Sequence, residues 1–496
     1  MTFGQAVHPG VYEWRLDRYP WSMASLRLSA RGALVAAAIG IGIALSPGRA
    51  LAVGEQITDV RVLDNQRTEE STVRSIAGIS IGDTLESDTL DTVRERLNTT
   101  GLFADVNVWW EANGSGVRVN ISVKDKFPWA PVPTASWSSN NKSIGLLFVH
   151  GNLFGHGKQL LIGGRLAQID SGAVIGYRDP SLFGTWAYWQ LQGVVQRQII
   201  PEYQNSGVTP LGVATLANPY EFRETRLFSY GFEPAFGIAW MRRVKTQVAW
   251  HLEKFEYFDV GSDNPVTGAP TVQATSPGTS GFGRAMLSFD FRAREFSVMT
   301  GQALTGSVDY GSPAFGSDFT FWRVGAGWEQ GIKFFRSHNL IYSVGGVFSN
   351  NVPFWNENTA GGTNLRGYLG QQFRGDTQLG GKLEYHFPLF SISSLDFRAL
   401  GFYDVQAVWF RDLPTGTDLT DPITGATYRQ RDTTDRRSLS TGPVPLPTGF
   451  GRDAIHNDVG VGLRFFLRSV AVPLVGVDFG YGIEAANWQF IIIVGA

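Results

Sequence analysis

The chain has 496 residues, 17% of them charged, with a formal net charge of −2 and no cysteine. This charge gives no reason to expect a nucleic-acid partner, and the lack of cysteine excludes disulfides and cysteine-based zinc sites. The 59 Gly, 15 Trp, 15 Tyr and 34 Phe residues are typical of a glycine- and aromatic-rich β protein.

The first 52 residues are predicted to contain a secretory signal peptide that starts at Met23. A short basic segment precedes the apolar residues 33–45, and the small-residue site Ala50-Leu51-Ala52 follows them. This order is that of a cleaved signal peptide, and the apolar segment is short for a membrane-spanning helix, although a signal anchor is the alternative. We expect the mature chain to begin near Val53, outside the cytoplasm.

Residues 53–127 are predicted to form a small α+β domain. Apolar spacing predicts an order of β-α-α-β-β, with helices at 72–79 and 89–98. This order and the sequence LNTTGLFADVNV, residues 97–108, resemble a POTRA domain, the periplasmic module that precedes outer-membrane barrels. The resemblance implies that client chains are guided by adding a strand at a sheet edge. A generic α+β domain without a function of its own is the alternative.

Residues 128–496 are predicted to form an all-β, transmembrane antiparallel barrel of about 16 strands. Residues 244–253 are one of several segments in which apolar and polar residues alternate, as in a sheet with one apolar face. Long connections are predicted near 201–221, 260–280, 349–376 and 412–456. They alternate with short turns, which favours a membrane barrel over a secreted sandwich. Aromatic residues near strand ends fit interfacial girdles: Trp186, Trp189, Trp240, Tyr257, Trp409 and Trp488.

The glycine-rich segment Gly361–Tyr368 interrupts the strand pattern and carries a single arginine, Arg366. Its glycines permit positive φ and close backbone approach, so the segment is predicted to fold back as a loop. A buried arginine needs carboxylate partners, because an unpaired buried charge is costly. Strand parity places Glu384 and Asp404 on the lumen face of two later strands, which makes them candidate partners.

Five motifs carry a resemblance to a known family. They are GNLFGHGKQL (151–160), YRDPSLFG (177–184), LRGY (365–368), QLGGKLEYHFPLF (378–390) and FYDVQAVW (402–409). In order and spacing they resemble the bacterial surface antigen barrel of BamA-type and TamA-type outer-membrane assembly factors and of two-partner secretion proteins. The resemblance implies a loop lock formed by Arg366, Gly367 and Tyr368, received by two acidic positions that match Glu384 and Asp404.

Two positions depart from the family pattern. Gln406 stands where the motif usually has glycine, so it is expected to limit how closely Tyr368 or the loop backbone approaches. The family commonly ends on an aromatic residue that the assembly machinery recognises, whereas this chain ends Val494-Gly495-Ala496. We therefore expect Phe490, with Ile492, to carry the terminal-strand signal, and the seam between the first and last strands to be loose.

The resemblance implies a factor that assembles or inserts proteins in the Gram-negative outer membrane, with the POTRA domain in the periplasm. A two-partner-type secretion pore is the first alternative, and a passive porin or structural barrel is the second. The expected partners are unfolded outer-membrane or secreted polypeptides, membrane lipid and periplasmic accessory proteins. No catalytic residue, cofactor or metal is expected.

Overall fold

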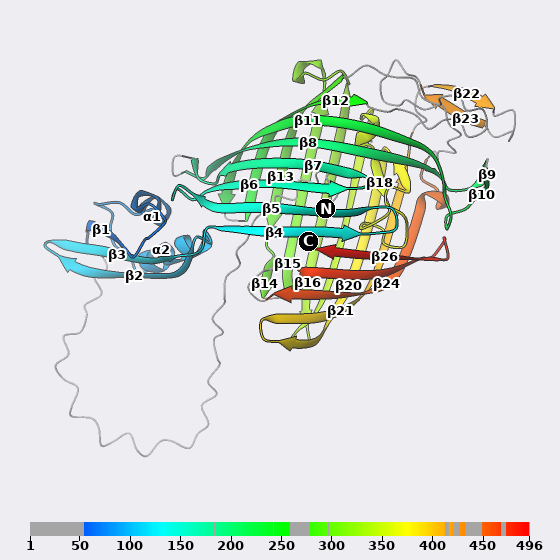
Figure 1. Ribbon diagram of the computed structural model, residues 1–496. Helices are drawn as coiled ribbons and strands as arrows, with labels where there is room; N and C mark the ends of the chain where they lie inside the picture. The colour runs from blue at the N-terminus through cyan, green and yellow to red at the C-terminus, as the bar shows by residue number, and fades with distance from the viewer. Residues whose placement is uncertain are drawn as a thin grey trace, which may run out of the picture. The chain divides into compact units, whose positions relative to one another are not determined.

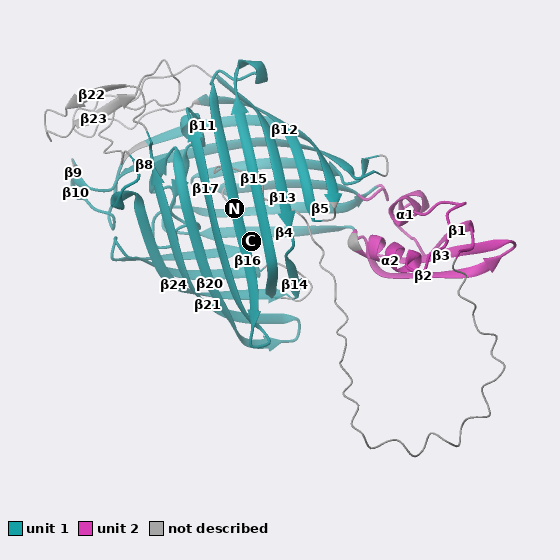
Figure 2. Cartoon of the chain, turned by 180° about the vertical axis from the view of Figure 1, so that it is seen from behind, with its two compact units in different colours: residues 1–16, 128–153, 158–496 teal, residues 17–127, 154–157 magenta. Residues whose placement is uncertain are grey.

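The computed structural model describes residues 54–182, 185–209, 211–241, 243–257, 278–295, 297–411, 416–420, 427–431, 449–467 and 473–495. The predicted signal peptide and most of the predicted loops at 260–280 and 412–456 lie outside the described residues. The described chain forms two compact units (Figure 2). One comprises residues 54–127 and 154–157, and the other comprises the remaining described residues.

The N-terminal unit is a three-stranded sheet with two helices. Its elements are β1 (Ile57–Leu63), α1 (Glu70–Ala77), α2 (Thr89–Thr99), β2 (Phe103–Asn113) and β3 (Gly116–Asp125). The sheet order is β1-β3-β2, with β1 parallel and β2 antiparallel to β3. Apolar residues of the helices, such as Val73 and Leu97, are buried with apolar residues of β3, such as Val119. The predicted order of helices and strands is therefore observed.

One carboxylate at the end of β3 organises the turn before α1. Asp125 Oδ2 accepts hydrogen bonds from the backbone N–H groups of Gln66 at 2.7 Å and Arg67 at 2.8 Å. The Thr68 hydroxyl donates to the other carboxylate oxygen. Burial alone would raise the pKa of Asp125, but these hydrogen bonds outweigh it and hold the pKa below its usual value.

This arrangement predicts an acid-sensitive turn. Because the pKa of Asp125 is lower in the folded state, its contribution is present above the unfolded pKa of about 4 and is lost as the pH falls below it. We expect Asp125→Asn to cost about 1 kcal/mol, reduced by solvent access, and to remove this pH dependence. Hydrogen exchange of the amides of residues 66–68, corrected for intrinsic rates, measures the effect. Asp91→Asn is the control, since Asp91 pairs only with Arg94 on an exposed helix face; equal protection in Asp125→Asn and the parent at pH 7 contradicts the prediction.

The second unit is a closed antiparallel barrel of sixteen strands, counting β14 as a continuation of β13 (Figure 1). The strands are β4 (Trp129–Trp137), β5 (Lys142–Leu153), β6 (Lys158–Ala167), β7 (Asp170–Asp179), β8 (Ala187–Gln204), β11 (Tyr220–Met241), β12 (Val244–Tyr257), β13 (Gly278–Asp290), β14 (Ala293–Glu295), β15 (Val298–Gly311), β16 (Phe321–Phe334), β17 (His338–Asn350), β20 (Thr377–Ile392), β21 (Leu395–Trp409), β24 (Ile455–Leu467), β25 (Pro473–Gly482) and β26 (Asn487–Val494). The predicted fold class is confirmed.

Short elements occupy the connections between barrel strands. They are the strand pairs β9 (Gly207–Thr209) with β10 (Gly212–Ala214), β18 (Asn358–Ala360) with β19 (Phe373–Gly375) and β22 (Gly416–Thr420) with β23 (Thr427–Arg431), and the 3₁₀ turns η2 (Pro313–Phe315), η3 (Phe354–Asn356) and η5 (Arg452–Ala454). Within the described parts of the chain, no helix is both long and apolar enough to span a membrane.

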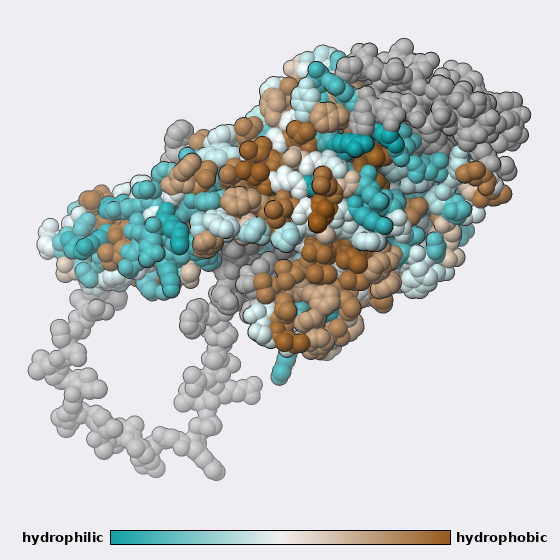
Figure 3. All heavy atoms as spheres, viewed as in Figure 1, coloured by the Kyte–Doolittle hydropathy of each residue, from teal (hydrophilic) through white to brown (hydrophobic). Residues whose placement is uncertain are grey.

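The two faces of the barrel wall differ as the alternation predicts. On β12, Val248 is 59% exposed on the outer face, whereas its neighbour Gln247 is buried. Apolar residues spread over the outer face of the wall in Figure 3. Trp186, Trp240 and Trp488 are also exposed, as expected for girdle residues. Trp409 is not: it is buried in a small cluster with Ala407 and Ala454, so its predicted place in a girdle is wrong.

The inner face carries buried charges that meet partners on neighbouring strands. Arg284 on β13 donates to both carboxylate oxygens of Asp309 on β15, at 2.8 and 3.0 Å. The same guanidinium lies 3.5 Å from Glu233 on β11, which also contacts His251 on β12. Ion pairs between neighbouring strands of the inner face offset the free-energy cost of burying these charges.

The barrel closes through a short junction between its first and last strands. Only three residue pairs join β26 to β4, namely Ile492–Trp137, Ile493–Ser136 and Val494–Ala135, and Figure 1 shows these two strands side by side. By comparison, β26 forms eight pairs with β25, and β4 forms nine with β5. This junction, called the seam below, therefore has the fewest ladder hydrogen bonds to lose.

Candidate functional site

The candidate site is built on the connection between β17 and β20, residues 351–376, called the inner loop below. Within it β18 pairs with β19, and the segment between these two short strands folds back on itself. Gly361 and Gly362 have φ values of 123° and 66°, which L side chains rarely adopt. The Gly362 amide donates to the carbonyl of Tyr368 at 3.0 Å, closing the turn that presents Arg366. The predicted folded-back loop is observed.

Arg366 points into the lumen wall and meets carboxylates on three strands. Its Nε and one terminal nitrogen donate to the two oxygens of Asp404 on β21, at 2.7 and 2.8 Å. The other terminal nitrogen donates to Glu384 on β20 at 2.7 Å and to Asp478 on β25 at 3.4 Å. The guanidinium carbon lies 3.5 Å from the ring centroid of Phe402, so a π face covers the ion pairs. The Arg366 side chain is only 4% exposed.

Strand register explains why the two predicted carboxylates lie together. Lys382 of β20 is opposite Asp404 of β21, and Glu384 is opposite Phe402, so Glu384 and Asp404 are diagonal neighbours on the same face. Their odd-numbered neighbours Leu383 and Tyr403 are exposed on the outer face. The structure thus brings Arg366, Glu384 and Asp404 together.

Three further acidic residues contact the inner loop and were not predicted. Asp478 approaches Arg366, Asp458 of β24 accepts from the Gly367 amide at 2.8 Å, and Glu484 accepts from the Tyr368 hydroxyl. The alternation along β24 and β25 would have placed Asp458 and Asp478 in the lumen. Nothing in the alternation says which lumen carboxylate meets the loop.

Two glycines of β25 allow the backbone of the inner loop to pack closely against the barrel wall. A Cβ on Gly480 would lie 2.6 Å from the carbonyl carbon and oxygen of Arg366. A Cβ on Gly482 would lie 2.7 Å from the carbonyl oxygen of Gly367, and one on Gly367 itself would lie 2.4 Å from the Gly482 nitrogen. Backbone therefore packs on backbone here, which no larger residue permits.

Gln406 contacts the backbone of the inner loop through its side chain. Its amide nitrogen donates to the carbonyl of Asn364 at 3.3 Å, and its oxygen accepts from Gln378 at 3.0 Å. Gly380 lies opposite on β20, where a Cβ would be 2.2 Å from the Gln406 oxygen. Gly380 therefore leaves room for the Gln406 side chain to lie against β20.

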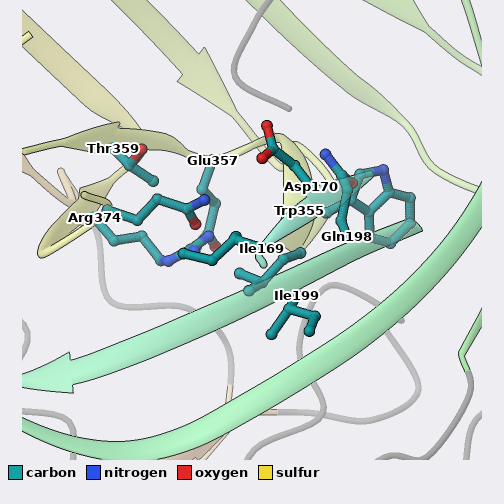
Figure 4. A pocket seen from close by; sticks show the side chains of 10 residues that line it. Ile169, Asp170, Gln198, Ile199, Trp355, Glu357, Thr359 and Arg374 are labelled. Carbon is teal, nitrogen blue, oxygen red and sulfur yellow. The ribbon is translucent and has the colours of Figure 1, made fainter. Parts of the chain in front are cut away.

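The first part of the inner loop is anchored separately by aromatic residues. Phe354 and Trp355 are buried in an apolar cluster with Phe255, Phe319 and Phe321. Arg374 supports them, since it donates to the Phe354 carbonyl at 2.9 Å and lies 3.4 Å from Glu357. Figure 4 shows a small cavity beside this anchor, with polar side chains of β7 and β8 facing the loop. The inner loop is therefore held at two places inside the barrel.

The inner loop also reaches the turn between β4 and β5. The Asn140 side chain accepts from the Gly370 amide at 3.2 Å and donates to the Gly370 carbonyl at 2.9 Å. On the other side of the seam, Tyr368 bonds to Glu484 in the turn between β25 and β26. The loop thus contacts both sides of the seam through hydrogen bonds.

The predicted terminal-strand residues lie apart from this cluster. Phe490 faces Phe479 of β25 at a ring-centroid distance of 4.8 Å, and Phe479 is exposed on the outer face. Ile492 pairs with Trp137 across the seam. Among the described residues, no group of three or more His, Asp or Glu side chains is arranged to hold a metal ion.

A closed sixteen-stranded barrel with an apolar outer face, a charged interior and a loop bound in its lumen defines the class: a transmembrane β-barrel. The Omp85 superfamily domain model matches residues 152–484, more than half of the chain. The chain belongs to the Omp85 superfamily.

Solved structures agree with this fold. BamA from Haemophilus ducreyi lacking POTRA domains 1–3 is similar with a TM-score of 0.59 and 15% identity, over 89% of this chain and 84% of that one. CdiB from Acinetobacter baumannii gives a TM-score of 0.56 and 13% identity, over 89% and 74% of the two chains. A comparison with curated protein sequences gives no match. The structural likeness, at these identities, concerns the fold.

Proposed function

We propose that this protein inserts or assembles polypeptides in the outer membrane of Gram-negative bacteria, through lateral opening of the seam. The observation that carries the proposal is that the seam has three residue pairs, whereas the adjoining strand pairings have eight and nine. Opening it would expose unpaired backbone N–H and C=O groups, to which an extended client strand adds by β-augmentation. This mechanism needs neither a catalytic residue nor a cofactor.

In this proposal the N-terminal α+β unit is a periplasmic POTRA domain that guides unfolded outer-membrane or secreted clients. Its strands β1 and β2 both lie at the edges of the three-stranded sheet, so each has one side without a strand partner among the described residues. Periplasmic accessory proteins and membrane lipid are the further partners expected for such a barrel.

A secretion pore is the second candidate. It is favoured by the position of the inner loop, which is bound inside the lumen and would act as part of a gate for a translocating chain. A passive porin is less compatible with the structure. The apolar cluster around Phe354 and Trp355 fills lumen space that a permanently open pore needs.

Depletion of the protein, followed by comparison of the outer-membrane and secreted proteomes, distinguishes these functions. Loss of integral barrels supports insertion, and loss of one large secreted protein supports translocation. An unchanged protein content with altered solute uptake supports the porin. Recovery of the protein from the soluble periplasmic fraction, without a mobility shift on unheated gels, contradicts all three.

The terminal strand offers a test of how the protein itself is assembled. We expect Phe490→Ala to slow assembly severalfold, because Phe490 is the last aromatic residue of β26. The rate is measured after pulse labelling as the appearance of the heat-modifiable form. Phe479→Ala is the control, since it removes the same ring contact from β25. Equal slowing in both variants would point to packing, and a normal rate in Phe490→Ala would refute the recognition role.

A further inference from the structure

The first half of β4 has an open edge that contains two prolines. Every residue of β4 from Trp129 to Trp137 pairs with β5, but β26 pairs only with Ala135, Ser136 and Trp137. Within the described residues, no strand pairs with positions 130–134 on the seam side. Pro131 and Pro133 lie in this stretch and are exposed.

The direction of the proline backbone groups follows from hydrogen bonds at the two ends of β4. Next to one end, the Pro128 carbonyl accepts from the Gly151 amide of β5 at 2.7 Å. Next to the other, the Ser138 amide donates to the Asn141 carbonyl at 2.9 Å. Since backbone groups of successive residues point to opposite edges of a strand, the even-numbered residues face β5.

The odd-numbered residues of β4, including both prolines, therefore face the seam. The position of Gly495 agrees independently, because a Cβ built on it would lie 2.3 Å from the Pro133 carbonyl oxygen. The register between β4 and β5 is continuous, so Pro131 faces the same way as Pro133.

Proline has no N–H, and here both missing donors fall on the open edge. The ladder between β4 and β5 loses nothing, since that ladder uses the even-numbered residues. The seam side of the strand retains the carbonyl acceptors of Pro131 and Pro133 without the donors that normally accompany them. An added strand would form about half of the usual hydrogen bonds at these positions.

We propose that this stretch of β4 is an acceptor-only docking edge for an extended strand of a client polypeptide, and that Pro131 and Pro133 keep the docked strand short-lived. The inference rests on the proposed function. A strand that replaces β26 beside Ala135–Trp137 and continues in the same direction runs onto this edge, whereas β26 ends at Val494 and is followed by Gly495, with a φ of 68°.

The client is recognised through its backbone: it must supply N–H donors opposite Pro131 and Pro133, and its own carbonyls there find no donor on β4. Carbonyls without partners are costly in a membrane, so a docked strand is not closed permanently into the barrel at these positions. The same property disfavours lasting edge-to-edge pairing of two copies of the chain.

The test restores the missing backbone N–H donors at positions 131 and 133. Full-length protein in lipid nanodiscs is given a fluorescent synthetic peptide that copies Trp488–Val494 and continues with five alternating valine and threonine residues. We expect Pro131→Val/Pro133→Val to hold the peptide roughly tenfold longer than the parent, from two added backbone hydrogen bonds. Docking is located by a disulfide between a cysteine in the peptide and Val132→Cys, since the parent has no cysteine.

Ala130→Val is the matched control. It adds a β-branched side chain to the same strand, but its N–H faces β5 and is present in both proteins. Each variant is first checked for the heat-modifiable form, and each single proline variant is measured beside the double one. An unchanged peptide lifetime in a folded double variant, equal lengthening in Ala130→Val, or no disulfide in any variant overturns the inference.

The outcome is separable from that of the proposed function. If depletion of the protein removes client proteins, but the proline substitutions leave the peptide lifetime unchanged, only the acceptor-only edge is contradicted. If the proline substitutions lengthen the peptide lifetime as expected, but depletion of the parent protein changes neither the outer-membrane nor the secreted proteome, only the proposed function is contradicted.

Discussion

Arg366→Ala is expected to release the inner loop from the lumen wall while the barrel stays folded. The substitution leaves Asp404, which is fully buried, and Glu384 without their shared cation. Breaking a buried ion pair typically costs about 3–5 kcal/mol, and the low exposure of Arg366 places it in that range. The barrel keeps its circuit of backbone hydrogen bonds, so the heat-modifiable form should persist while client handling is lost.

Cleavage of residues 361–372 by protease added outside intact cells measures this release. Arg366→Lys should restore protection only partly, because a point charge cannot replace the paired contacts to Asp404 and the contact to Glu384. Glu384→Gln and Asp404→Asn should resemble Arg366→Ala and add little to it. The control is Arg284→Ala, which breaks a comparable buried pair with Asp309 between two other strands, β13 and β15. Equal cleavage in Arg284→Ala, or strictly additive losses at Arg366, Glu384 and Asp404, contradicts a loop lock.

Gly480→Ala should release the same loop without removing any charge. The new methyl group would lie 2.6 Å from the carbonyl carbon and oxygen of Arg366, which are both backbone atoms and cannot rotate aside. Overpacking of this kind typically costs about 1–3 kcal/mol, enough to shift the loop away from β25. We therefore expect protease cleavage and loss of client handling as in Arg366→Ala, in a barrel of normal heat-modifiability.

Gly401→Ala is the matched control for this substitution. Gly401 lies on β21, and a Cβ there meets nothing within 4 Å. A difference between the two alanine variants isolates the contact with the loop backbone from the general effect of glycine replacement in a strand. A loop that remains protected in Gly480→Ala shows that close packing on β25 does not hold it.

The alternation of side chains was the informative part of the sequence. It depends only on the two-residue period of a strand, so it placed Glu384 and Asp404 on the inner face before any register was known. The resemblance to a family selected the same two residues. The POTRA-like order of elements followed in the same way from helical and strand periods, with boundaries within a few residues of those observed.

Contacts between distant parts of the chain could not be predicted in this way. Asp478 and Glu484 reach the loop from more than 100 positions further along the chain, and only the closed barrel brings them there. Gly480 and Gly380 are informative because of what lies opposite them, which a single sequence does not contain. Trp409 was misplaced for the related reason that burial near a strand end depends on the following loop.

The hydrogen bonds of the inner loop to both sides of the seam make the two elements thermodynamically linked. Asn140 beside β4 holds Gly370, and Glu484 beside β26 holds Tyr368, so the two sides cannot separate widely without breaking one of these contacts. Linkage is reciprocal: whatever free energy a docked loop adds to the closed seam, an open seam removes from loop docking. Binding of a client from the periplasmic side would therefore increase the exposure of the inner loop at the cell surface.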